Sequence, residues 1–238
     1  MNIDKNLVKK YLNYKDENCD FDIVIEDVFA EMKSIATPKK NCILSDVSFE
    51  NGFYKLDNLG IVLKSNDINK LFCECDKIAT LVVTLGLEID KKIAYYAKVD
   101  LAKSLIMDAA SNVWVEAVMD ELEAQVCKQM DGKFKTMRFS PGYGDLDISV
   151  QKSVIERTGS NKFLGINVNS NYLMTPLKSI TAFLGFSDKK QVFADICLTC
   201  PQKGKCQTKC SRASHWFANL IYQMLCLIWC LLILFLCA

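Results

Sequence analysis

Histidine is almost absent from this sequence of 238 residues, which contains only His215. Catalysis by paired imidazoles is therefore excluded, and hydrolysis by a serine–histidine pair is disfavoured. His215 borders an apolar segment, so we interpret it as a boundary residue rather than as a metal ligand. Any chemistry must be carried by other side chains.

An excess of charge of one sign is also missing, since 29 lysine and arginine residues oppose 28 aspartate and glutamate residues. No global electric field therefore favours nucleic acid as a partner. The N-terminus is polar and soon charged, without the apolar core of a signal peptide. In a chain that is not exported, the 12 cysteines are expected to be reduced thiols or metal ligands, and the expected location is cytoplasmic.

Half of the residues are hydrophobic, which is enough for one main core. Apolar residues at helical intervals predict helices over residues 3–14 and 21–34. In the second helix the side chains expected to be buried are Ile23, Val24, Val28 and Met32. The dipeptide Asn51-Gly52 predicts a hairpin, and the aliphatic run 78–85 predicts a buried strand, after which a helix resumes.

Residues 100–130 form the longest helical pattern, which stops at Asp131-Gly132. A row at i+4 spacing is expected to face the interior: Leu101, Leu105, Ala109, Val113 and Ala117. By spacing alone, a second row is expected to be the solvated face: Asp108, Asn112, Glu116 and Asp120. Residues 163–166 and 180–184 are predicted as strands, so the fold class is α+β with an antiparallel sheet.

Residues 138–144, Arg-Phe-Ser-Pro-Gly-Tyr-Gly, place a cation beside a rigid turn. Proline fixes φ, glycine lets a ligand approach the main chain closely, and the arginine fork can hold a carboxylate with two hydrogen bonds. The pattern suits a nucleotide-like amino acid as ligand. An ordinary surface turn that an arginine happens to precede is the alternative.

Two segments resemble one family, the S-adenosylmethionine-binding activation domain of vitamin B12-dependent methionine synthase. The family's Arg-x-x-Pro-Gly-Tyr signature is matched by Arg138, Pro141, Gly142 and Tyr143. Further along the chain, the family's Met-x-Pro-x-x-Ser segment is matched by Met174, Pro176 and Ser179. Glu116 is similar to a ligand-binding glutamate on a helix of the family. The resemblance runs from Val82 to Phe186.

This resemblance implies a fold of mixed helices and a twisted antiparallel sheet that binds S-adenosylmethionine. Arg138 would hold the methionine carboxylate, and Glu116 would favour the cationic amine or sulfonium. The backbone of residues 141–143 would line the pocket, with Tyr143 facing the corrinoid. The implied function is reductive remethylation of a cobalamin, whose cobalt gains an electron and then takes the methyl group. The domain would supply positioning rather than acid–base catalysis.

The sequence also departs from the family's pattern. It has no corrinoid-binding Asp-x-His-x-x-Gly motif, so cobalamin is expected on a partner, a corrinoid-binding methionine synthase or methyltransferase subunit. The chain is therefore expected to be a stand-alone activation component. Lys178 adds a charge that could repel the sulfonium or serve the substrate carboxylate.

Four soft ligands lie close together near the end of the chain: Cys197, Cys200, Cys206 and Cys210. Neighbouring lysines lower thiol pKa values and favour the thiolate that a metal needs. A 4Fe-4S cluster that delivers the electron, or a closed zinc site, is expected, although the spacing matches neither standard pattern fully. Structural or incidental thiols are the alternative.

Residues 216–238 carry no charge and are long enough to span a bilayer as a helix. The cations before this segment would keep the domain at the inner face of the cell membrane. A partner-binding helix or an altered reading frame is the alternative.

The expected organisation has four parts: residues 1–75, N-terminal helices and a small sheet within the main domain; 76–196, the S-adenosylmethionine-binding core; 197–212, the metal-binding loop; and 216–238, the apolar helix. Two functions are consistent with it. One is a reactivation component that binds S-adenosylmethionine, docks a corrinoid protein and receives an electron from a donor. The other is a non-catalytic, membrane-tethered metal or redox adaptor that docks a corrinoid protein.

Overall fold

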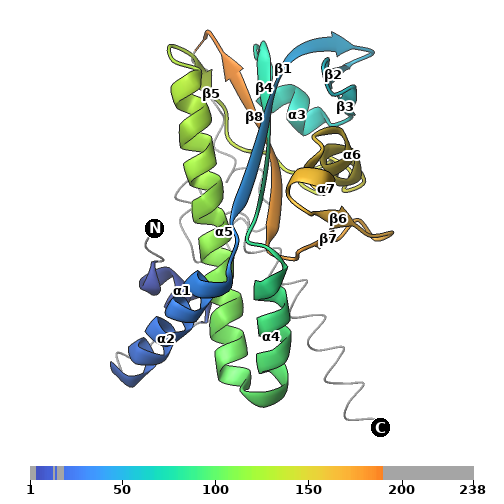
Figure 1. Ribbon diagram of the computed structural model, residues 1–238. Helices are drawn as coiled ribbons and strands as arrows, with labels where there is room; N and C mark the ends of the chain where they lie inside the picture. Colours follow the sequence, from blue (N-terminus) through green and yellow to red (C-terminus); the bar gives the residue numbers. More distant parts are fainter. Residues whose placement is uncertain (1–3, 13, 15–18, 190–238) are drawn as a thin grey trace. The chain divides into compact units, whose positions relative to one another are not determined.

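The computed structural model describes residues 4–12, 14 and 19–189, which all lie in the compact unit Met1–Gln191. A second unit, Val192–Ala238, lies outside the described residues. The helices are α1 Lys5–Tyr11, α2 Cys19–Ile35, α3 Asn66–Leu71, α4 Leu87–Val99, α5 Leu101–Gln129, α6 Val150–Arg157 and α7 Ser160–Phe163 (Figure 1). The strands are β1 Lys39–Glu50, β2 Phe53–Leu56, β3 Ile61–Leu63, β4 Lys77–Thr84, β5 Phe134–Lys135, β6 Asn167–Val168, β7 Met174–Thr175 and β8 Ser179–Ser187.

One antiparallel sheet of six strands has the order β3-β2-β1-β4-β8-β5, and β6 pairs separately with β7. The central strands β4 and β8 are rich in aliphatic residues and are buried almost throughout, as expected for strands covered on both faces. The turn between β1 and β2 lies at Asn51-Gly52, where both residues have positive φ. The predicted hairpin and the predicted α+β class are therefore confirmed.

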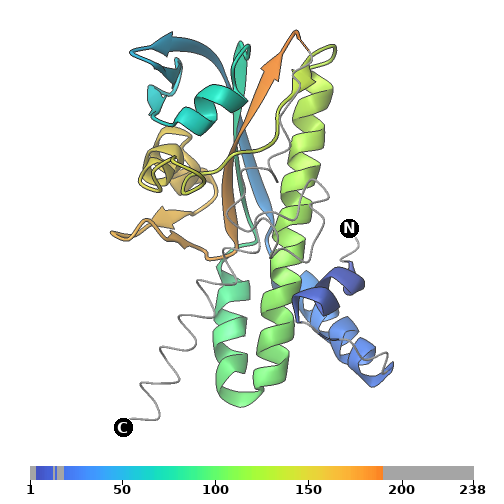
Figure 2. The same ribbon diagram turned by 180° about the vertical axis from the view of Figure 1, so that it is seen from behind.

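Helix α5 lies along one face of the sheet, while α3, α6 and α7 lie on the other (Figures 1 and 2). It begins after Asp100, whose side chain accepts a hydrogen bond from the backbone NH of Lys103 at 3.1 Å. It ends before Gly132, which has a φ of 81°. Because the sheet, α1, α2 and α4 all pack against it, most of α5 is buried. On α5, Asp108 and Asn112 accept hydrogen bonds from Lys178, which directly precedes β8.

The prediction that Leu101 and Leu105 face the interior is wrong, because these side chains are 64% and 46% exposed. The first turns of α5 pack on α4 rather than on the sheet. Ser104 makes this close contact, donating from its hydroxyl to the carbonyl of Ile93 at 3.1 Å. With Ser104 facing α4, the two leucines are turned outward.

Two further local predictions are corrected. In α2, Ile23 is 58% exposed, and the buried side chains are Ile25, Val28, Phe29 and Met32. Residues 163–166 do not form a strand, because Phe163 ends helix α7 and β6 begins only at Asn167. Glycines with positive φ at positions 159 and 165 bracket this helical turn and separate it from the strand.

Candidate functional site

The segment that begins at Arg138 is fixed against β8. Phe139 and Phe183 exchange two backbone hydrogen bonds, of 2.9 and 2.7 Å. The buried hydroxyl of Ser140 donates to the carbonyl of Thr181 at 2.7 Å. These bonds fix the backbone directly after Arg138, whose side chain points toward α5.

The turn that follows is also preorganised. Gly142, with a φ of 86°, donates its NH to the carbonyl of Leu146 at 2.9 Å. A side chain would be strained in this conformation, so the glycine is required by the turn itself. The carboxylate of Asp145 then accepts hydrogen bonds from the hydroxyl of Ser65 and from the NH of Asn66, the latter at 2.8 Å. These contacts link the turn to the start of α3.

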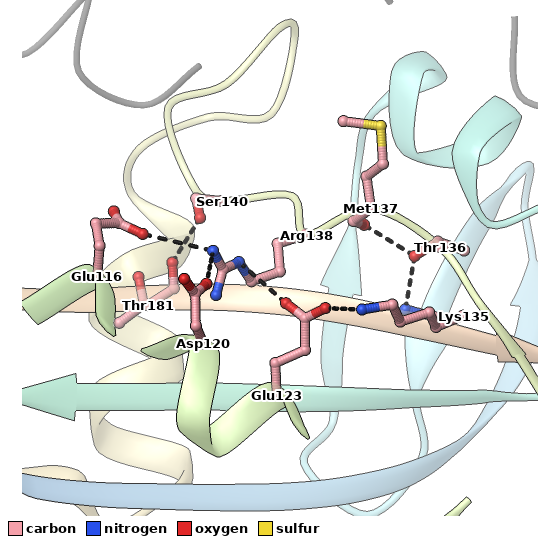
Figure 3. A network of polar contacts seen from close by, with 10 residues as sticks. Glu116, Asp120, Glu123, Lys135, Thr136, Met137, Arg138, Ser140 and Thr181 are labelled. Carbon is pink, nitrogen blue, oxygen red and sulfur yellow. Dashed lines mark hydrogen bonds and ion pairs between the residues drawn. The ribbon is translucent and has the colours of Figure 1, made fainter. Parts of the chain in front are cut away.

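The guanidinium of Arg138 meets three carboxylates of α5 (Figure 3). Its Nη2 lies 2.7 Å from Oδ1 of Asp120 and 3.5 Å from Oε2 of Glu116, and its Nε lies 3.3 Å from Oε2 of Glu123. Lys135 pairs with the other oxygen of Glu123. The structure thus brings together Arg138 and Glu116, which the motif resemblance had predicted as site residues. Asp120 and Glu123 also belong to this cluster.

This geometry changes the role expected for the arginine fork. The side chain of Arg138 is only 9% exposed, and its Nε and Nη2 already face acidic side chains. Its Nη1 is buried and has no hydrogen-bond partner among the described residues. A two-bond grip on a ligand carboxylate would require displacement of an α5 carboxylate. One donor, Nη1, is left for an acceptor other than the described residues of the chain.

Burial raises the pKa of Glu116 to about 7; Arg138 opposes this rise and Asp120 adds to it. The hydroxyls of Tyr11 and Tyr143 lie within electrostatic range of the same carboxyl, and burial raises the pKa of both tyrosines above the usual value. No motif or periodic pattern had indicated that Tyr11, on α1, belongs to this cluster. A carboxyl that titrates near neutrality beside a guanidinium can receive a cationic group and a neighbouring anionic group of one ligand.

The Met-x-Pro-x-x-Ser motif leads into the start of β8 and fixes its backbone. Met174 is half-buried in β7, and Pro176 is buried. The hydroxyl of Ser179 donates to the carbonyl of Pro176 at 2.7 Å and lies 2.8 Å from the hydroxyl oxygen of Thr84. These bonds fix the backbone on either side of Lys178, whose ammonium reaches the polar row of α5. The side chain of Lys178 thus connects this motif with the helix that carries Glu116.

The predicted metal cluster, Cys197, Cys200, Cys206 and Cys210, and the predicted apolar helix 216–238 lie outside the described residues. Across residues 4–12, 14 and 19–189, no group of three or more potential ligands could hold a metal ion. Within the same part of the chain, none of the helices has the length and apolar character needed to cross a bilayer. Cys42 and Cys127 are free thiols.

Comparisons with known proteins agree with the motifs. The family model for the activation domain of vitamin B12 dependent methionine synthase matches residues 68–198, more than half of the chain. Among solved structures, 13 chains match, and one is described as the MetH reactivation domain bound to AdoHcy. It shares 13% sequence identity and a TM-score of 0.52, with 78% of this chain and 71% of that chain covered, which shows a common fold. No curated protein matches the sequence.

Proposed function

Because the chain belongs to the family of activation domains of vitamin B12-dependent methionine synthase, we propose that it binds S-adenosylmethionine and supports reductive remethylation of a cobalamin. Membership of this family implies a corrinoid-binding partner or module, which would present the cobalamin. S-adenosylmethionine supplies the methyl group, and a separate donor supplies one electron to the cobalt. The chain's own contribution is to bind and orient the methyl donor.

The observation that carries this proposal is the contact between Arg138, in the family's Arg-x-x-Pro-Gly-Tyr motif, and Glu116 on α5. The buried Nη1 of Arg138, which has no hydrogen-bond partner within the described part of the chain, offers one hydrogen bond to the ligand's carboxylate. The buried carboxyl of Glu116, 3.5 Å from the same guanidinium, favours the ammonium or sulfonium once it is ionised. Tyr143 lies within electrostatic range of both groups, and the Pro141-Gly142 backbone would continue the site. A zwitterion with an additional positive charge is complementary to this arrangement.

The proposed function is tested by methyl transfer to a corrinoid protein. The full chain is mixed with a separately prepared corrinoid-binding module in the cob(II)alamin state, a one-electron reductant and S-adenosylmethionine labelled in its methyl group. Label is expected to appear on the cobalamin at a rate that depends on the concentration of the chain. Omission of the reductant is the control and should abolish transfer. Transfer at the same rate without the chain would contradict the proposal.

The affinity for S-adenosylmethionine is expected to increase with pH between about 6 and 8. A cationic ligand binds better to the ionised form of Glu116, and the carboxyl, with a pKa of about 7 in the free protein, ionises in this range. Calorimetry in two buffers of different ionisation enthalpy should accordingly detect release of a proton on binding at pH 6.5. The Glu116→Gln variant is the control and should bind more weakly, with little dependence on pH. Uptake of a proton by the unaltered chain would contradict the assignment.

A further inference from the structure

A second polar cluster lies on the same face of α5, one turn before Glu116. The side chain of Lys178 is 4% exposed, and its ammonium donates to Oδ1 of Asp108 at 2.6 Å and to Oδ1 of Asn112 at 2.7 Å. The side chain of Asp108 is 34% exposed. Asp90, on α4, is within electrostatic range, since Lys178 opposes the rise that burial causes in its pKa. The buried ammonium is therefore a fixed charge held by α4, α5 and the start of β8.

This charge is close to the proposed ligand site. Asn112 and Glu116 are four residues apart on α5, which corresponds to about 6 Å along the helix axis. Because the ammonium of Lys178 lies 2.7 Å from Asn112, we place it on the order of 10 Å from the carboxyl of Glu116. Opposite or like charges at this separation still interact in a partly buried environment, where salt screens them less than in water.

Among the described residues, this polar region, which includes Asp90 of α4, has more acids than bases. Five carboxyl groups occupy it: Asp90, Asp108, Glu116, Asp120 and Glu123. Three cations oppose them: Lys135, Arg138 and Lys178. Arg138 and Lys135 pair with Glu123 at one end of the row. Lys178 pairs with Asp108 at the other end and offsets the negative charge there. Removing its charge would increase the excess of acids from two to three.

We propose that Lys178 and Asp108 form a specificity-determining pair that sets how strongly the site prefers a cationic ligand over a neutral one. The inference rests on the proposed binding of S-adenosylmethionine. That ligand carries a net positive charge through its sulfonium, whereas S-adenosylhomocysteine, the product of methyl transfer, has lost this charge. Lys178 reduces the attraction of the site for cations. The affinity for S-adenosylmethionine therefore exceeds that for S-adenosylhomocysteine by a smaller factor than it would without Lys178. The pair acts through its field and does not need to touch the ligand.

The expected size of the effect follows from distance. A unit charge about 10 Å away, in surroundings of intermediate polarity, changes the relative affinity for a cation about three- to tenfold. Lys178→Met is expected to increase the preference for S-adenosylmethionine over S-adenosylhomocysteine by this factor. Asp108→Asn leaves Lys178 unbalanced and should decrease the preference, about twofold, because Asp108 is partly exposed and better screened.

The test is a calorimetric titration of the full chain and its variants with each ligand at low salt. The double variant Lys178→Met/Asp108→Asn restores the charge balance and should return the ratio of affinities to within about twofold of the original. Lys152→Met, on the exposed side of α6, is the control and should leave the ratio unchanged. Salt at 0.5 M should reduce every shift in the ratio.

Equal weakening of both ligands by Lys178→Met would overturn the inference, since it would indicate a structural role alone. Failure of the double variant to restore the ratio would also overturn it. Should Lys178→Met not fold, Lys178→Gln and Asp108→Asn provide the same comparison. Lack of binding of either ligand to the unaltered chain would instead reject the proposed function, and with it this inference.

Discussion

Replacement of Arg138 by alanine is expected to lower the free energy of unfolding by about 3–5 kcal/mol at pH 8. The side chains of Arg138 and Glu116 are each 9% exposed, and that of Glu123 is 15% exposed. Without the guanidinium these acids remain buried near one another, and among the described residues only Lys135 pairs with one of them. Urea denaturation monitored by circular dichroism measures the change.

The loss should be smaller at pH 5, where the unpaired acids of the variant can be protonated at little cost. Arg138→Lys retains the charge but not the planar fork, and should be less destabilising than alanine. Lys152→Ala, at an exposed ion pair, is the matched control and should change stability by less than about 0.5 kcal/mol. A loss below about 1 kcal/mol in Arg138→Ala would show that the cluster contributes little to the fold.

Glu116→Gln is expected to stabilise the free protein by up to about 3 kcal/mol at pH 8 and to leave its stability nearly unchanged at pH 4. The pKa of Glu116 is about 7 in the folded protein, against a usual value of 4.5. The folded state therefore binds the proton more tightly, and stability is lost as pH rises from 4.5 through 7. Glutamine resembles the protonated acid in shape and cannot ionise, so the variant lacks this loss.

The measurement is the free energy of unfolding at pH values from 4 to 8. The difference between Glu116→Gln and the unaltered chain should grow with pH and level off above 7. Lys152→Met, at an exposed ion pair of α6, is the control and should leave the free energy of unfolding nearly unchanged at each pH. A Glu116→Gln variant that is less stable at pH 8 would mean that the ion pair with Arg138 outweighs the cost of burial.

Much of the fold could be predicted from local pattern. Asn51-Gly52 has the backbone preference of a two-residue hairpin turn, and the hairpin lies there. The aliphatic run in β4 is buried as expected. Helix α5 stops at the predicted Asp131-Gly132. The wrong predictions concern residues whose burial depends on tertiary packing. Leu101 is exposed because α4, rather than the sheet, covers the beginning of α5.

The candidate site was predicted in part. Motif resemblance identified Arg138 and Glu116, and the structure places their side chains 3.5 Å apart. Sequence spacing had predicted that the row containing Glu116 was a solvated face. A periodic pattern does not show which other elements will cover a helix face, so the burial of Glu116 could not be read from it. Glu123 and Tyr11 join the cluster only through tertiary packing. The i+4 row of polar residues was the one signal that could have indicated a continuous polar face.

The central claim is that S-adenosylmethionine binds at the Arg138 turn, and calorimetric titration of the full chain with this ligand tests it most directly. The account predicts saturable binding to the unaltered chain. Arg138→Lys, which retains the charge but loses the Nη1 donor, is expected to weaken binding at least tenfold while remaining folded. Binding that is equally strong in Arg138→Lys, or no binding to the unaltered chain, would contradict the account.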